Sequence, residues 1–172
     1  MRMVAGVDPG LTGAVALLDT ADGRVVSVED LPVMSKTWGK GQEVDGNALA
    51  ALLRSIAPDL VLIERVRAMP PRPVGGKLRQ AGTASMFAFG HGAGVIEGVL
   101  AGLQIPRRYV EPAVWKKRAR LTGKDKDAAR TLAIQTHPEI AGELIRKKDV
   151  GRADAVLIAE FGLAQPGIGD LL

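Results

Sequence analysis

Three short apolar runs open the chain within residues 1–31, and turn sequences at Pro9-Gly10 and Asp22-Gly23 separate them. Runs of this length with turn residues between them are typical of β-strands joined by tight connections. The pattern therefore predicts an antiparallel meander of three strands.

A helix and a buried strand follow a polar, glycine-containing stretch. In "NALAALLRSIA" the residues Leu49, Leu52, Leu53 and Ile56 recur at helical spacing, which predicts a crossover helix. The next segment, "DLVLIE", has few polar residues on either face, as is typical of a central strand covered on both sides. We expect it to pair beside the first strand.

The rest of the chain is mainly helical. The sequence predicts a long helix from Thr83 to Leu103, a short strand at "RRYV", and helices that begin near Pro112, Lys126 and Arg152. No internal repeat or linker divides the 172 residues, so we expect one domain over residues 1–172. This order of elements predicts an α/β fold with a mixed sheet.

Composition and charge narrow the function classes. The chain has 23 Lys and Arg against 19 Asp and Glu, and this net charge of +4 is compatible with a polyanionic partner. It has no cysteine and only two histidines, which excludes disulfides and argues against a zinc site. No apolar run approaches the length of a membrane span, and an acid at Asp8 replaces a signal-peptide core. We therefore expect a soluble, untargeted cytoplasmic protein with no membrane partner.

Three acids stand at the borders of apolar elements. Asp8 ends the first strand and Glu64 ends "DLVLIE", while Asp154 shares one helix face with Leu157 and Ile158. Each acid also has an ordinary explanation. Asp8, before Pro-Gly, can satisfy backbone donors of a turn, and Glu64 can be the first residue of a solvated loop. Asp154 can be an acid that the helix dipole stabilises in the first turn.

Convergence of the three acids in space would explain all of them at once. Carboxylates crowded into a partly dry site repel one another unless a cation lies between them. Oxygen ligands without sulfur or imidazole select Mg²⁺ or Mn²⁺, and two such ions roughly 4 Å apart catalyse phosphodiester hydrolysis. The pattern indicates nuclease chemistry, with Asp149 as a weaker fourth candidate.

The segments "GVDPGLTGAVALLD", "VLIERV" and "GRADAVLIAEFG", in that order, resemble the RuvC-like Holliday junction resolvases of the ribonuclease H-like superfamily. The resemblance runs from about Val4 to Phe161 and is strongest to phage and small bacterial members. It implies a ribonuclease H-like fold, with a five-stranded mixed sheet whose first three strands are antiparallel and helices flanking it. It further implies a homodimer that cuts four-way DNA junctions with Mg²⁺, in a bacterial cytoplasm or a phage-infected cell. Asp8, Glu64 and Asp154 are then the metal-binding carboxylates.

Two positions depart from the pattern of this family. Its members often place an acid or a histidine three residues before the last aspartate, where this chain has Gly151. Asp149 is a possible substitute, or the site has three protein ligands. Family members also often carry an aromatic residue three positions beyond the glutamate to stack at the junction, where this chain has Arg67.

Basic residues form two clusters. No Asp or Glu occurs from Arg65 to Ile96. This stretch is suited to binding a phosphate backbone, and the alternative is that it is only a solvated loop. The second cluster resembles the basic segment that contacts DNA in RuvC-like proteins, and its alternative is a solvated helical face. The candidate DNA-binding residues are Arg67, Arg72, Lys77, Arg79, Lys116, Lys117, Lys124 and Lys126.

Glycine patterns exclude two nucleotide-binding motifs and reveal a stripe. "LTGKDKDA" lacks the first glycine and the Ser or Thr of a phosphate-binding loop, and "GHGAGVIEGVLAG" lacks the third glycine of a dinucleotide motif. Gly90, Gly94, Gly98 and Gly102 instead recur every four residues. This stripe lets the helix approach another backbone, either within the chain or in a dimer.

The sequence leaves several functions open beside a junction-resolving endonuclease. A noncatalytic nucleic-acid-binding module would carry the same basic clusters. A related nuclease would act on RNA or on other branched DNA, because phosphate contacts carry little identity information. A nucleotide-binding ATPase of the same fold would need a second domain that 172 residues do not hold.

Overall fold

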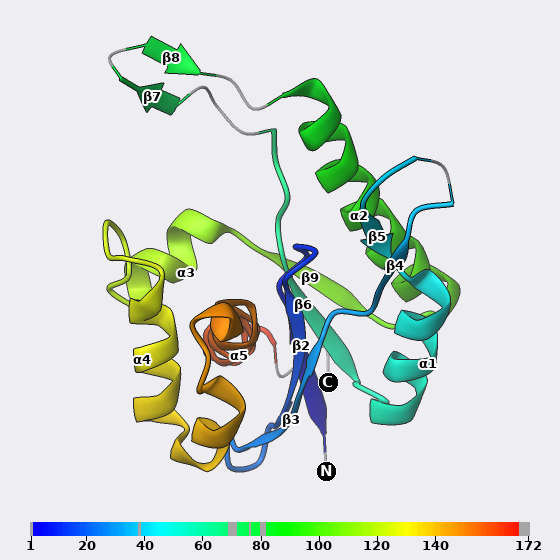
Figure 1. The fold of residues 1–172 in the computed structure, drawn as a ribbon. Coiled ribbons are helices and arrows are strands. Elements are labelled where there is room, and N and C mark those ends of the chain that lie inside the picture. The colour runs from blue at the N-terminus through cyan, green and yellow to red at the C-terminus, as the bar shows by residue number, and fades with distance from the viewer. Residues whose placement is uncertain (1, 38, 69–71, 76, 80–81, 169–172) are drawn as a thin grey trace.

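The computed structural model describes residues 2–37, 39–68, 72–75, 77–79 and 82–168 (Figure 1). Five strands form the main sheet in the spatial order β3-β2-β1-β6-β9. They are β1 (Met3–Val7), β2 (Ala14–Asp19), β3 (Val25–Asp30), β6 (Leu60–Glu64) and β9 (Arg107–Val110). The first three strands are antiparallel, whereas β6 and β9 run parallel to β1.

Helices cover both faces of this sheet (Figure 1). The helices α1 (Gly46–Ile56) and α2 (Thr83–Gly102) cover one face. The other face carries α3 (Pro112–Arg118), α4 (Asp127–Thr136) and α5 (Val150–Leu163), with two 3₁₀ segments, Pro138–Leu144 and Lys147–Asp149, between α4 and α5. The predicted α/β fold with a mixed sheet is confirmed, including the pairing of the buried strand beside the first.

Two short hairpins were not predicted. One pairs β4 (Val33–Ser35) with β5 (Gln42–Val44), and the other pairs β7 (Arg72–Val74) with β8 (Lys77–Arg79). Their strands have three residues each, too few to show a period-2 pattern. The β7–β8 hairpin extends away from the body of the molecule (Figure 1).

Helix α5 lies unusually close to the sheet because small residues face each other there. A Cβ added at Gly6 of β1 would fall 2.1 Å from the Ala155 carbonyl oxygen, and one at Gly162 would fall 1.9 Å from the Leu62 side chain. At Gly6 the neighbours include backbone atoms of α5, so no side chain larger than hydrogen fits there without moving the helix, whereas at Gly162 the Leu62 side chain would have to shift. The sequence of α5 is correspondingly rich in alanine and glycine.

The glycine stripe of α2 faces outward. A Cβ added at Gly90, Gly94, Gly98 or Gly102 would have no neighbour within 4 Å, and all four positions are exposed. The helix packs inward through its other side, where Ala93, Ile96 and Leu100 are buried. Packing of the stripe within the chain, one of the two expectations for it, is therefore wrong.

Helix α2 also corrects the expectation that no apolar run approaches the length of a membrane span. Its 20 residues are long and apolar enough to cross a membrane by length and composition, and 22% of its most apolar window is buried. The helix is apolar mainly through glycine, alanine and scattered larger residues, so it contains no long run of large aliphatic side chains. A core helix of a soluble protein passes the same test.

Candidate active site

The sheet register brings Asp8 and Glu64 to the same edge. Strands β1 and β6 are parallel, and Val7 pairs with Ile63, so the next residue of each strand is an acid. Side chains alternate along a strand, and the residues two and four positions earlier, such as Val4 and Leu62, face α5. Both acids therefore lie at the carboxyl ends of neighbouring strands, on the face that α5 covers.

Asp154 reaches this edge from α5. The contact between Gly6 and Ala155 sets the height of the helix on the sheet, and Asp154 lies one residue before that contact. The turn after β1 supports the arrangement, because the backbone amide of Asp8 donates to the Ala14 carbonyl at 3.1 Å. The amide of Gly10 donates weakly to Asp8 Oδ1 at 3.4 Å. The three predicted acids thus come from three separate segments of the chain.

Burial and neighbouring negative charge raise the pKa values of Asp8 and Asp154. Burial, followed by repulsion from Glu64, raises the pKa of Asp8 from 3.8 to about 6. Burial, followed by repulsion from Asp8 and to a lesser degree Glu64, raises the pKa of Asp154 from 3.8 to about 7. Lys116 opposes both shifts. Two poorly solvated carboxylates beside further negative charge are an arrangement that a cation relieves.

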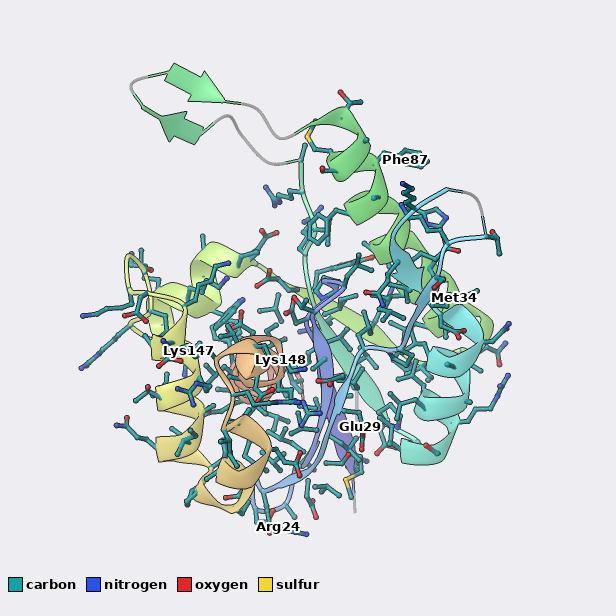
Figure 2. The ribbon with its side chains drawn as sticks, viewed as in Figure 1. Arg24, Glu29, Met34, Phe87, Lys147 and Lys148 are labelled. Carbon is teal, nitrogen blue, oxygen red and sulfur yellow. The ribbon has the colours of Figure 1, made fainter. Side chains whose placement is uncertain are left out.

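A cavity of about 440 Å³ opens at these acids. Asp8 and Asp154 line it together with Thr12 and Asp125, and five lysines surround them: Lys116, Lys124, Lys126, Lys147 and Lys148. Lys147 and Lys148 lie just before α5, and Figure 2 shows them near α4 and the start of α5. The cavity therefore combines an acidic floor with a basic rim.

Glu64 lies beside this cavity and is held from α3. The indole Nε1 of Trp115 donates to Glu64 Oε2 at 2.7 Å. Lys116 Nζ is 3.8 Å from the same oxygen and lies over the Trp115 ring, 4.9 Å from its centroid. Because β9 ends at Val110 next to Glu64, the helix that follows it delivers both side chains to the glutamate.

The donor set fits a hard divalent cation in chemistry. Asp8, Glu64 and Asp154 offer only carboxylate oxygens, the ligands that Mg²⁺ prefers. Within the described residues, no three His, Cys, Asp or Glu side chains form a ready-made metal cluster.

Asp149 is not brought to the cavity. Its carboxylate accepts from the Arg146 backbone amide at 2.7 Å and forms an ion pair with the Arg146 guanidinium at 2.8 Å. Burial raises the pKa of Asp149, but the hydrogen bonds from Arg146 outweigh burial and lower it overall. The structure gives Asp149 the role of closing the turn before α5.

Gly151 leaves no space for a fourth ligand three residues before Asp154. A Cβ there would lie 2.1 Å from the Thr12 carbonyl oxygen and 2.9 Å from Gly13 Cα. The loop after Asp8 and the first turn of α5 touch through their backbones at this point. The departure from the family pattern thus has a packing cause.

The predicted basic residues do not all lie at the cavity. Lys116, Lys124 and Lys126 line the cavity, whereas the exposed Lys117 does not. Arg67 forms an ion pair with Glu111 at 2.7 Å, and this carboxylate also contacts Arg65. The side chains of Arg72, Lys77 and Arg79 lie outside the described part of the structure, although their backbone forms the β7–β8 hairpin.

Several polar residues at or beside the cavity were not predicted from the sequence, among them Thr12, Trp115, Asp125, Lys147 and Lys148. Lys147 and Lys148 stand just before the helix that carries Asp154, so their place in the chain could have indicated the same site. Trp115 precedes a predicted basic residue, but nothing in its sequence context points toward Glu64.

Comparison with known proteins identifies the fold. No protein-family model matches the sequence, and no curated protein is significantly similar to it. One similar solved structure is Thermus thermophilus RuvC in complex with Holliday junction substrate, with 17% identity, coverage of 92% of this chain and 90% of that chain, and a TM-score of 0.56. Another is Thermus thermophilus RuvC, with 17% identity, coverage of 92% and 91%, and a TM-score of 0.48. The chain has the RuvC-like, ribonuclease H-like fold that its motifs predicted.

The raised pKa values predict that the acidic centre destabilises the metal-free protein at high pH. When the pKa of a carboxyl rises on folding, the folded protein loses stability as the pH increases between the two pKa values. For Asp154 this range runs from the ordinary pKa of 3.8 to the folded value of about 7. Asp154→Asn should therefore raise the melting temperature in EDTA at pH 8 by at least ~3 °C, with a smaller gain at pH 5. Differential scanning fluorimetry measures both.

Asp149→Asn is the matched control for this experiment. The pKa of Asp149 is lowered on folding, so its ionised form stabilises the native state above pH 3.8. This variant should melt at a lower temperature than the wild type at both pH values. Equal melting temperatures for Asp154→Asn and the wild type at pH 8 would contradict the crowding of the three acids.

Proposed function

We propose that the protein is a Mg²⁺-dependent endonuclease that binds branched DNA and hydrolyses phosphodiester bonds at four-way junctions. The observation that carries this proposal is the acidic floor and lysine rim of one cavity, on the RuvC-like fold. The proposal takes its substrate from the similarity of the fold to a RuvC that was solved with Holliday junction substrate.

The lysine rim is suited to a phosphate backbone. Ammonium groups bind phosphate as point charges and release counterions from nucleic acid when they do so. Within the described residues, no carboxylate lies within salt-bridge distance of Lys124, Lys126, Lys147 or Lys148. These four side chains are therefore available to position a phosphodiester over the acids.

Asp8, Glu64 and Asp154 would hold the metal, with Mg²⁺ preferred and Mn²⁺ as a substitute. When bound, a divalent ion supplies Lewis-acid stabilisation of the charge that develops on the phosphoryl oxygens. The protein's part is to keep the carboxylates oriented and to hold the scissile phosphate with the rim lysines. Lys116, which lies nearest to Glu64, adds positive charge at the same place.

Neutral substitutions of the three acids test the catalytic proposal. Asp8→Asn, Glu64→Gln and Asp154→Asn should each lower the rate of junction cleavage by at least ~10²-fold, because each removes electrostatic stabilisation from the site. Junction binding should stay within about twofold of the wild type, since the lysine rim is unchanged. Cleavage of a labelled four-way junction in Mg²⁺ and a gel-shift measurement in EDTA give the two quantities.

Asp149→Asn is the control for cleavage. It alters a carboxylate close in sequence to Asp154 that does not line the cavity, and it should cut at the wild-type rate below its melting temperature. Two acid variants that cut normally would refute the metal site. Cleavage of a flap, a duplex or an RNA–DNA hybrid at the same rate would show that the protein does not select four-way junctions. Binding without any cleavage would show that it is a noncatalytic module.

Salt dependence tests the rim. The double variant Lys147→Gln, Lys148→Gln should lower the slope of log affinity against log salt concentration by about two, because each lost phosphate contact lowers it by about one. Arg72→Ala, Lys77→Ala and Arg79→Ala together test the hairpin in the same way. The control variant Arg24→Ala, at the opposite end of the molecule from the hairpin (Figure 2), should leave the slope unchanged. A slope unaffected by either set would show that those side chains are only solvated.

A homodimer completes this proposal, because paired incisions in a four-way junction need two sites related by a two-fold axis. The exposed face of α2 is the surface that supports it. Its glycines project no side chain, and Phe87 near its start is 74% exposed. Figure 2 shows Phe87 on the outer side of this helix. A second copy of α2 could approach this face closely and cover it.

Gly98→Leu should therefore convert the dimer to monomer in sedimentation velocity and change paired incision into slow single nicking. The control is Thr131→Leu, which adds a similar side chain to the exposed face of α4 on the other side of the sheet. It should stay dimeric and active. A wild-type protein that sediments as a monomer both free and on junction DNA would refute the dimer. If the protein instead bound lipid vesicles through α2, a membrane surface would take the place of the second copy as the partner of this face.

A further inference from the structure

Trp115 is the largest side chain in the core that also touches the acidic centre. Its relative exposure is 0%, and it packs in the apolar cluster between the sheet and α5. A buried indole N–H needs an acceptor, because an unpaired donor in the core costs about 1–3 kcal/mol. Here the acceptor is the carboxylate of Glu64, at 2.7 Å.

The geometry of this contact separates the two oxygens of Glu64. Oε2 receives the indole N–H and also faces Lys116 Nζ at 3.8 Å. The described residues provide no hydrogen-bond partner for Oε1. One oxygen is thus committed to the protein, and the other is left for a ligand.

The position of Trp115 is itself fixed on both sides. Glu111, at the start of the same helix, pairs with Arg65 and Arg67, which follow Glu64 in the chain. The ring of Trp115 is enclosed by the core, so its N–H has one direction available. The segment after β6 and the helix α3 are therefore joined at two points, and Glu64 lies at the inner one.

We propose that Trp115 is a positioning residue that holds Glu64 through Oε2 and so presents Oε1 to the divalent metal. This inference rests on the proposed metal site. A hydrogen bond to a metal-binding side chain orients that side chain, and loss of such a bond typically lowers metal affinity by about 10–100-fold. Trp115 contacts neither the metal nor the substrate, and it acts only through Glu64.

Trp115→Phe removes the N–H and keeps an aromatic ring in the core. The half-saturating Mg²⁺ concentration should rise about tenfold or more, both in junction cleavage and in isothermal titration calorimetry with Mg²⁺ alone. Junction affinity in EDTA should stay within twofold, as should the cleavage rate at saturating Mg²⁺. Phe161→Leu is the control, because it trims an aromatic of the same core that does not contact Glu64. It should leave the Mg²⁺ midpoint unchanged.

Tryptophan fluorescence gives a readout that needs no cleavage and no Trp115 variant. The chain has two tryptophans, and Trp38→Phe leaves Trp115 as the single emitter. Its emission should change on titration with Mg²⁺ at the same midpoint as calorimetry, and Glu64→Gln should abolish the change.

The outcomes separate this inference from the proposed function. Emission from Trp115 that does not respond to Mg²⁺, or a Trp115→Phe protein with the wild-type Mg²⁺ midpoint, would overturn the positioning role. A protein whose Trp115 reports Mg²⁺ binding but which cuts no nucleic acid would overturn the nuclease function and leave the positioning role standing.

Discussion

The close approach of α5 to the centre of the sheet is the constraint on which the site depends. Gly6 and Gly162 remove the side chains that would hold helix and sheet apart, and Gly151 does the same between the helix and the loop after Asp8. With larger residues the helix would have to move outward, carrying Asp154 away from Asp8. The backbone contacts that allow packing thus also fix the spacing of two acids.

This packing forces two carboxylates into a poorly solvated place, which costs stability in the metal-free state. The raised pKa values of Asp8 and Asp154 express that cost, and Lys116 offsets part of it. Sites where electrostatics oppose folding are characteristic of function, because stability alone would favour apolar residues there. The lysines that line the same cavity place positive charge beside these acids.

Periodicity predicted most of the fold because each main element has an unambiguous pattern. The strands before Asp8 and Glu64 and the helix that carries Asp154 begin and end within a few residues of their expected places. The short hairpins escaped prediction because three residues cannot display a period. The outward direction of the α2 stripe also escaped, because a helix with glycine on one side and apolar residues on the other does not reveal which side meets the sheet.

The site shows a similar division between what sequence and structure can provide. Acids at strand ends could be predicted to converge, since parallel strands end at one edge, and the register of β1 and β6 has this effect. The hydrogen bond that orients Glu64 could not be predicted, because its donor Trp115 is 51 residues away and reaches the glutamate only through the packing of α3 beside β9. Two acids that share an edge can therefore differ in role. Asp8 and Asp154 line the cavity directly, while the orientation of Glu64 is set by the core behind it.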